Sequence, residues 1–168
     1  MSGMPESEVV PELVVTRSTL TAPVAQALIA ALNAELSAAY PEPGATHFRL
    51  EPSDVAPGRG AFLVAELAGR PVGCGALRPV GAPGLDERTG ELKRMYVAPE
   101  ARGRGIGRAL LTALEAEART LGFTRLVLET GPRQQAALGL YRNAGFAPID
   151  AYGEYRSSPV SVCLAKAL

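Results

Sequence analysis

The chain has 168 residues, enough for one domain with its own hydrophobic core, which we expect over residues 11–168 after a flexible start at residues 1–10. Seventeen basic residues balance 17 acidic ones, so the composition indicates no general attraction to nucleic acid or to an anionic membrane surface. The longest apolar run, residues 27–32, is too short to span a membrane, and residues 1–11 carry no secretory pattern, so we expect a cytoplasmic protein.

Two cysteines, Cys74 and Cys163, stand far apart among small or apolar neighbours. The sequence has no Cys-x-x-Cys pair and no cluster of histidine with cysteine, which are the usual patterns of a zinc site. We therefore expect no metal site, and two buried, reduced thiols rather than a disulfide.

The first predicted elements are a strand and a helix. Residues 12–17 are rich in β-branched side chains and predict the strand. Thr21 is a candidate N-cap, and with Pro23 in the first turn it predicts a helix that ends near Ala39. Residues 40–60 are rich in proline and predict a long loop, of a kind that is often functional.

Three predicted strands follow in the middle of the chain. Residues 61–67 and 72–80 flank a short turn that contains glycine and proline, and they predict a β-hairpin. Residues 81–89 predict a connector, and residues 91–97 predict the third strand.

The last part of the chain alternates helices and strands. Residues 103–121 carry apolar side chains at helical spacing and predict a helix, followed by a strand at residues 125–130. Strand, helix and strand in this order predict a right-handed parallel βαβ unit. Residues 133–144 predict another helix and residues 160–164 a final strand, which gives an α/β domain with a mixed sheet and helices on both faces.

A glycine-rich segment, residues 102–108 (RGRGIGR), stands between a predicted strand and a predicted helix. Glycines allow close approach to the backbone, and the first amides of a helix have no intrahelical partners, so the segment predicts an anion site suited to phosphate. Arg102, Arg104 and Arg108 add positive charge at the same place. A tight turn that binds nothing is the alternative explanation for such glycines.

Spacing excludes two common nucleotide-binding motifs for this segment. A P-loop ends in Gly-Lys-Ser/Thr, whereas Gly107 is followed by Arg108 and Ala109. A dinucleotide fingerprint needs the spacing G-x-G-x-x-G after an early strand, whereas here single glycines alternate in the middle of the chain.

Three segments together resemble the GNAT superfamily of acetyl-CoA-dependent N-acetyltransferases. Arg102-x-x-Gly105-x-Gly107 is similar to the superfamily signature Q/R-x-x-G-x-G/A. Residues 137–146 (ALGLYRNAGF) are similar to its A-x-x-LY-x-x-x-GF helix, and residues 91–99 (ELKRMYVAP) to its central strand. The order and spacing of the three agree with the superfamily over residues 61–150.

The resemblance implies a fold and a binding mode for acetyl-CoA as co-substrate. The fold would be a single α/β domain with a mixed, mostly antiparallel sheet, in which the central parallel strands, residues 91–97 and 125–130, splay apart. Pantetheine would lie in that gap, and Gln134, where many members carry asparagine, would contact the cofactor. The other residues implied in cofactor binding are Met95, Tyr96, Val97, Arg102, Gly103, Arg104, Gly105, Ile106, Gly107 and Arg108.

The resemblance also implies two catalytic residues. Tyr141 matches a position whose phenol often gives a proton to the leaving thiolate, although a tyrosine that only packs its helix on the sheet is the alternative. Glu91 matches a position that serves some members as general base, directly or through water. Glu129 is the reserve candidate for the base, and catalysis by water alone is a third possibility.

The function that the resemblance implies is transfer of the acetyl group to a primary amine of a small molecule, by direct attack in a ternary complex. The alternatives are acetylation of a protein N-terminus or lysine, and a non-catalytic acyl-CoA sensor. A homodimer through the C-terminal strands would fit the superfamily. The acceptor itself is not specified by any motif, and candidates for its pocket are His47, Arg94, Tyr152 and Tyr155.

Overall fold

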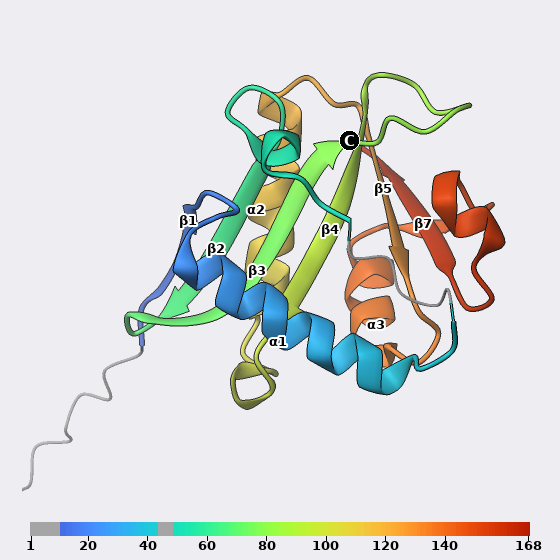
Figure 1. Ribbon diagram of the computed structural model, residues 1–168. Helices are drawn as coiled ribbons and strands as arrows, with labels where there is room; N and C mark the ends of the chain where they lie inside the picture. The colour runs from blue at the N-terminus through green and yellow to red at the C-terminus, as the bar shows by residue number, and fades with distance from the viewer. Residues whose placement is uncertain (1–10, 44–48) are drawn as a thin grey trace, which may run out of the picture.

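A computed structural model of the chain describes residues 11–43 and 49–168 (Figure 1). Residues 1–10, predicted to be flexible, and His47 lie outside these ranges. In the described part of the chain, seven strands form a single sheet in the order β1-β2-β3-β4-β5-β7-β6. The strands are β1 (Leu13–Arg17), β2 (Ala61–Leu67), β3 (Arg70–Pro79), β4 (Thr89–Val97), β5 (Arg125–Thr130), β6 (Ala147–Ile149) and β7 (Val162–Ala167).

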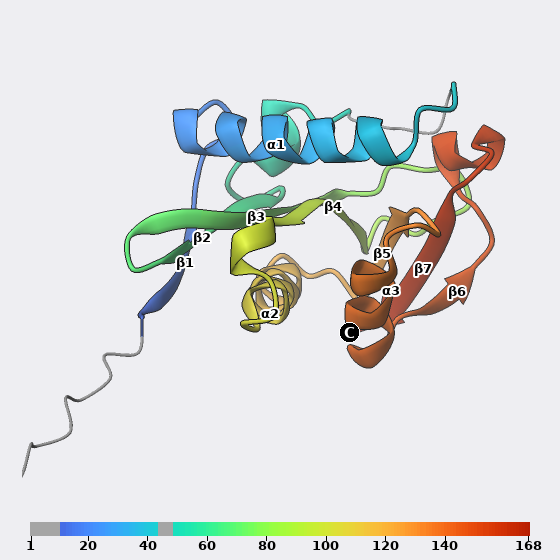
Figure 2. The same ribbon diagram turned by 90° about the horizontal axis from the view of Figure 1, so that it is seen from below.

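Helices cover both faces of this sheet, as predicted. The α-helices are α1 (Pro23–Ala39), α2 (Ile106–Thr120) and α3 (Gln135–Asn143), and the short 3-10 helices are η1 (Pro52–Val55), η2 (Pro99–Ala101) and η3 (Gly153–Ser157). Figure 2 shows α1 on one face and α2 with α3 on the other. The predicted hairpin and the predicted βαβ unit are confirmed, because β2 pairs antiparallel with β3, and β4 pairs in parallel with β5.

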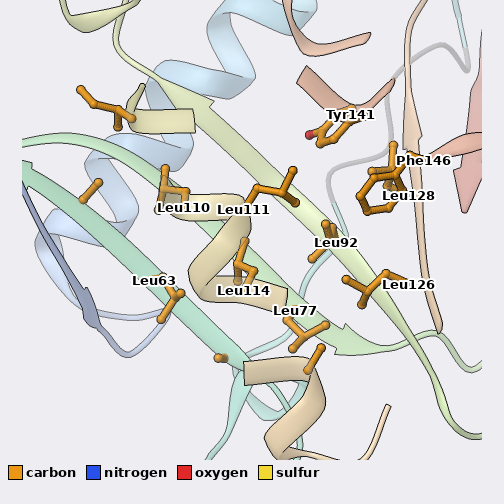
Figure 3. Packing of buried hydrophobic residues seen from close by; sticks show 14 of the residues in the cluster. Leu63, Leu77, Leu92, Leu110, Leu111, Leu114, Leu126, Leu128, Tyr141 and Phe146 are labelled. Carbon is orange, nitrogen blue, oxygen red and sulfur yellow. The ribbon is translucent and has the colours of Figure 1, made fainter. Parts of the chain in front are cut away.

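The main core lies between the sheet and the helices α2 and α3. Leu110 and Leu114 of α2 are fully buried, and Figure 3 shows them among leucines of β2, β3, β4 and β5. The 3.6-residue period of a helix brings such positions to one face, so apolar burial holds α2 against the sheet. Cys74 and Cys163, both buried with free thiols, lie in two smaller clusters on the α1 face.

Both helices on the main core end in the same way. Gly122 and Gly145 adopt left-handed backbone angles just after α2 and α3. The amide of Phe123 then donates to Ala118 O, and that of Phe146 donates to Tyr141 O, each at 3.0 Å. These are Schellman closures, and they turn each phenylalanine back onto its helix.

The central feature of the sheet is the separation of β4 from β5. Their parallel register runs only from the Thr89–Arg125 pair to the Leu92–Leu128 pair, so the second half of β4 leaves its neighbour while it stays paired with β3. A bulge marks the same place, because the register against β3 shifts there and Arg94 has a φ of 57°. The predicted splay of residues 91–97 from 125–130 is therefore confirmed, with its vertex at Leu92.

Some predicted boundaries were wrong. The helix predicted from residue 103 begins at Ile106, because Gly103 and Gly105 have φ values of 80° and 78°, which a right-handed helix does not allow. Ala22, not Thr21, is the N-cap of α1, and it makes no side-chain capping bond.

The sheet edge and the last strand also differ from the prediction. β6 was not predicted, since it is three residues long and contains Pro148, which only an edge strand accommodates easily. β7 begins and ends later than the predicted strand over residues 160–164.

Candidate active site

A cavity of about 80 Å³ lies where β4 and β5 separate. One wall comes from Leu32, Leu36 and Tyr40 of α1 and the residue that follows it. The remaining lining residues belong to the two strands, the β5–α3 turn and α3, and they are Leu92, Lys93, Arg94, Met95, Glu129, Thr130, Gly131, Gln134, Ala137 and Tyr141. The splay thus opens a partly polar space between the two central strands.

Tyr141 lies on the buried face of α3, with 5% of its surface exposed. Its ring packs edge-on against Phe146, with the ring centroids 5.7 Å apart, and Figure 3 shows the hydroxyl pointing away from Phe146. Burial raises the pKa of Tyr141 well above its ordinary value, and the negative charge of Glu129 raises it further. The phenol is therefore protonated at neutral pH and suited to give a proton within the cavity.

Glu129 lies on β5 and lines the same cavity. Burial raises the pKa of Glu129 above its ordinary value, whereas a hydrogen bond that Ser161 Oγ donates to Oε1 at 2.9 Å and the charge of Lys93 lower it. A carboxylate with a raised pKa accepts a proton more readily than an ordinary surface carboxylate. Glu129 and Tyr141 therefore place a carboxylate that can accept a proton and a phenol that can donate one on the wall of one cavity.

Glu91, the first candidate for the base, is placed differently. Its side chain is only 2% exposed and does not line the cavity. Arg78 Nε donates to Glu91 Oε1 at 2.8 Å, and the Tyr152 hydroxyl donates to Oε2 at 2.6 Å. Both oxygens are therefore occupied, and Tyr152, a candidate for the acceptor pocket, instead holds this buried carboxylate.

Two cationic residues line the cavity from β4. Lys93 is 6% exposed, and burial lowers the pKa of its ammonium. Arg94 is similarly buried, donates from Nη1 to Asn33 Oδ1 on α1, and accepts at its carbonyl oxygen from Cys74 Sγ at 3.2 Å. The sequence analysis did not single out Lys93; the available signal was a lysine between Leu92 and Arg94 in the middle of a strand, in a chain with only one other lysine, Lys166.

The predicted phosphate site forms an exposed turn at the start of α2. Gly105 is the N-cap of the helix, and the first intrahelical bond runs from Ala109 N to Gly105 O. The amides of residues 106–108 therefore point out of the helix end without intrahelical partners, where the helix dipole is positive. Gly107 also allows close packing, since a Cβ there would lie 3.2 Å from Leu140 Cδ2.

Three arginines lie at this turn, of which one is hydrogen-bonded to β4 and α1 and two are exposed. Arg102 donates from Nε to Val97 O at 2.9 Å and pairs through Nη2 with Glu35 Oε1 at 2.7 Å, so it joins the end of β4 to α1. Arg104 and Arg108 are exposed. The half-buried residues Met95, Tyr96 and Val97 complete β4 between the cavity and this turn, so the predicted cofactor-binding residues other than Gln134 follow one another along the chain from β4 to the start of α2.

Gln134 has a structural contact as well as a place on the cavity wall. Its Oε1 accepts from Thr130 Oγ1 at 3.1 Å and from Gly131 N at 3.2 Å, so it closes the turn before α3. Tyr40, which the sequence did not indicate, donates from its amide to Leu36 O at 2.8 Å at the end of α1, and its hydroxyl oxygen accepts from Arg133 N at 2.8 Å. A Cβ on Gly131 would lie 2.0 Å from the Tyr40 hydroxyl, so this turn needs glycine.

Among residues 11–43 and 49–168, histidine, cysteine and carboxylate side chains form no group of three that could hold a metal ion. In the same residues, every helix is too short or too polar to cross a bilayer.

The sequence of the chain matches known acetyltransferases. The acetyltransferase (GNAT) family model matches residues 25–146. A protein of Azospirillum brasilense named IAA acetyltransferase is 46% identical over 107 residues, which cover 64% of this chain and 67% of that protein. Rat and mouse N-acetyltransferases that also match are longer, and the chain spans 41% and 37% of their length.

Solved structures agree with these matches. A Klebsiella pneumoniae protein assigned as an acyl-CoA N-acyltransferase is 35% identical, with a TM-score of 0.76 over 93% of this chain and 97% of that one. A GNAT family acetyltransferase of Elizabethkingia anophelis with acetyl-CoA bound has a TM-score of 0.63 over 93% of this chain and 98% of that one, and at 22% identity it shows a shared fold.

Proposed function

Because the chain belongs to the GNAT family of acetyltransferases, we propose that it transfers the acetyl group of acetyl-CoA to the primary amine of a small-molecule acceptor. The observation that carries the proposal is the cavity at the β4–β5 splay, which Glu129 and Tyr141 line together. In this proposal the pyrophosphate lies on the amides at the start of α2, and the pantetheine follows Met95 to Val97 into the splay.

The proposed reaction is direct attack in a ternary complex. The neutral amine attacks the thioester carbonyl carbon, so a C–N bond forms and the C–S bond breaks. The proton of the amine passes to Glu129, and the leaving sulfur takes the proton of the Tyr141 hydroxyl. The raised pKa of Glu129 supports its role as proton acceptor, and the raised pKa of Tyr141 keeps the phenol protonated, so that a proton is present when the thiolate forms.

Glu129 replaces Glu91 as the first candidate for the base in this proposal. The support is the hydrogen bonding of Glu91, whose two carboxylate oxygens already accept from Arg78 and Tyr152 away from the cavity. A cytoplasmic location and a homodimer stay predictions from the sequence.

The direct test is release of free thiol from acetyl-CoA in the presence of a panel of amines. Acceptor-dependent thiol release, with the acetylated amine identified by mass spectrometry, is the expected result. Binding of acetyl-CoA without turnover of any amine would instead support the sensor, and acetylation of peptides but of no small amine would support a protein acetyltransferase.

We expect replacement of Gly105 by alanine to weaken acetyl-CoA binding by about tenfold, because it strains the turn and places a Cβ where the pyrophosphate would approach the backbone. Gly105 has a φ of 78°, so an alanine there costs about 1 kcal/mol of folding stability as well. Isothermal titration calorimetry with acetyl-CoA measures the affinity.

Gly122→Ala is the matched control. Gly122 has a φ of 84° at the other end of α2, and a Cβ at either position meets no atom within 4 Å. Both variants should therefore lose similar melting temperature, but only Gly105→Ala should lose affinity. Equal affinities in the two variants would remove Gly105 from the cofactor site.

A further inference from the structure

Lys93 is buried in an unusual setting for a lysine. Among the described residues, its Nζ has no hydrogen-bond acceptor. The nearest carboxylate oxygen is Glu154 Oε1 at 3.8 Å, on a side chain that is 42% exposed, and the ring centroid of Tyr155 lies 5.8 Å away. A buried ammonium without a hydrogen bond is costly, so this position would be stabilised by an additional anionic partner.

The carboxylate of Glu91, which lies near Lys93, is hydrogen-bonded by other residues. Arg78 is the positive group nearest to Glu91 and binds both that carboxylate and Asp54, whose Oδ2 lies 3.3 Å from Nη1. Glu91 therefore already has its partners, the arginine and the Tyr152 hydroxyl. Burial lowers the pKa of Lys93, the charges of Glu91 and Glu154 raise it, and those of Arg78 and Arg94 lower it, so Lys93 has anions nearby but no hydrogen-bonded anion among the described residues.

The cavity has cationic and anionic sides. Lys93 and Arg94 line it from β4, and Glu129 lines it from β5. The flexible four-carbon side chain of Lys93 allows its ammonium to turn to a ligand in the cavity. A molecule with an amine and a carboxylate a few bonds apart would match both sides at once.

We propose that the acceptor is a small amino-carboxylate, such as an α-amino acid, whose carboxylate binds Lys93 and Arg94 while its amine faces Glu129. The inference rests on the proposed acetyl transfer and names the class of amine that it uses. The carboxylate would supply the hydrogen-bond acceptor that Lys93 Nζ lacks among the described residues. The small cavity volume, about 80 Å³, suits the reacting end of such a molecule.

The test compares pairs of acceptors that differ only in the carboxylate: α-amino acids, their α-carboxamides, and the corresponding decarboxylated amines. Thiol release is measured with the full chain and with Lys93→Met, an apolar side chain of similar length. We expect the full chain to prefer the carboxylates, and Lys93→Met to raise KM for the carboxylates relative to KM for the amides and amines by about 10- to 100-fold.

Lys166→Met is the matched control for loss of a partly buried lysine. Lys166 Nζ pairs with Glu115 Oε1 at 2.8 Å between β7 and α2, away from the cavity. This variant should keep the preference for carboxylates even if its melting temperature falls. Binding of N-acetylated amino acids, the products of the proposed reaction, gives a second readout by calorimetry, and Lys93→Met should weaken it.

The outcomes separate this inference from the proposed function. Turnover of amines without a preference for the carboxylate, or an equal KM increase for all three acceptor types in Lys93→Met, would overturn the inference and leave the acetyl transfer standing. Acetyl-CoA binding with no turnover of any acceptor would overturn the proposed function, and this inference with it.

Discussion

Replacement of Glu129 by glutamine is expected to lower kcat by about 100- to 1,000-fold, because it removes the group that accepts the proton of the amine. Glutamine keeps the size of the side chain and can still accept the hydrogen bond of Ser161. Steady-state thiol release from acetyl-CoA measures the change. The affinity for acetyl-CoA should remain close to that of the unmodified chain.

The pH profile gives a second readout for the same variant. A base must be deprotonated to act, so activity that depends on Glu129 falls as the pH drops through its pKa. Burial raises this pKa in the folded chain, so the acid limb should lie at higher pH than for an ordinary glutamate. Glu129→Gln should lack that limb.

The melting temperature of Glu129→Gln shows whether a loss of activity comes from unfolding. The pKa of Glu129 is raised on folding, so the ionised carboxylate lowers stability at pH values above its pKa in the unfolded chain. This destabilisation disappears at low pH, where the group is protonated in both states. Glu129→Gln should therefore keep or raise the melting temperature at neutral pH while it loses activity.

Glu91→Gln is the comparison that separates the two carboxylates. Arg78 would lose its fully ionic partner on β4, so this variant should lose stability, by about 1 to 3 kcal/mol for a buried charged hydrogen bond, and keep the acid limb. A kcat loss confined to Glu91→Gln, with Glu129→Gln unaffected, would return the base role to Glu91.

Replacement of Tyr141 by phenylalanine is expected to lower kcat by about 100-fold, since the leaving thiolate would then take its proton from water. The ring contact with Phe146 and the burial of the side chain remain in the variant, so the fold and the Kd for acetyl-CoA should change little. Single-turnover kinetics and calorimetry measure the two quantities separately.

A leaving-group series identifies the step that Tyr141 serves. Acetyl thioesters of more acidic thiols need less help from a proton donor, so the loss in Tyr141→Phe should shrink with them. The same loss for all thioesters, or an unchanged kcat with acetyl-CoA, would remove Tyr141 from proton transfer and leave it as a packing residue.

The sequence predicted the elements that depend on local pattern and on glycine. Glycine is favoured at positions with a positive φ because it has no Cβ. Such positions occur at Gly103 and Gly105 before α2 and at Gly122 and Gly145 after α2 and α3, so the spacing of these glycines located the turn and the two helix ends. The same spacing carried the resemblance to the GNAT superfamily. β6 escaped prediction because a three-residue edge strand has too little alternation to detect.

The division of roles among charged residues depended on contacts that no local pattern encodes. Glu91 and Glu129 are both carboxylates on central strands. Glu91 accepts hydrogen bonds from Arg78 of β3 and from Tyr152, which follows β6, whereas Glu129 lines the cavity. Lys93 is inconspicuous in the sequence for the same reason, since its environment includes residues far along the chain, such as Glu154 and Tyr155.

The sequence by itself determined the family, the parallel βαβ unit and the glycine turn before α2, because these depend on residue spacing within single segments and on backbone geometry that glycine permits. The tertiary structure decided where the sheet opens and which side chains face the opening. Hydrogen bonding and burial set the charge and proton affinity of Glu129, Tyr141 and Lys93, and both depend on neighbours that folding brings from distant parts of the chain.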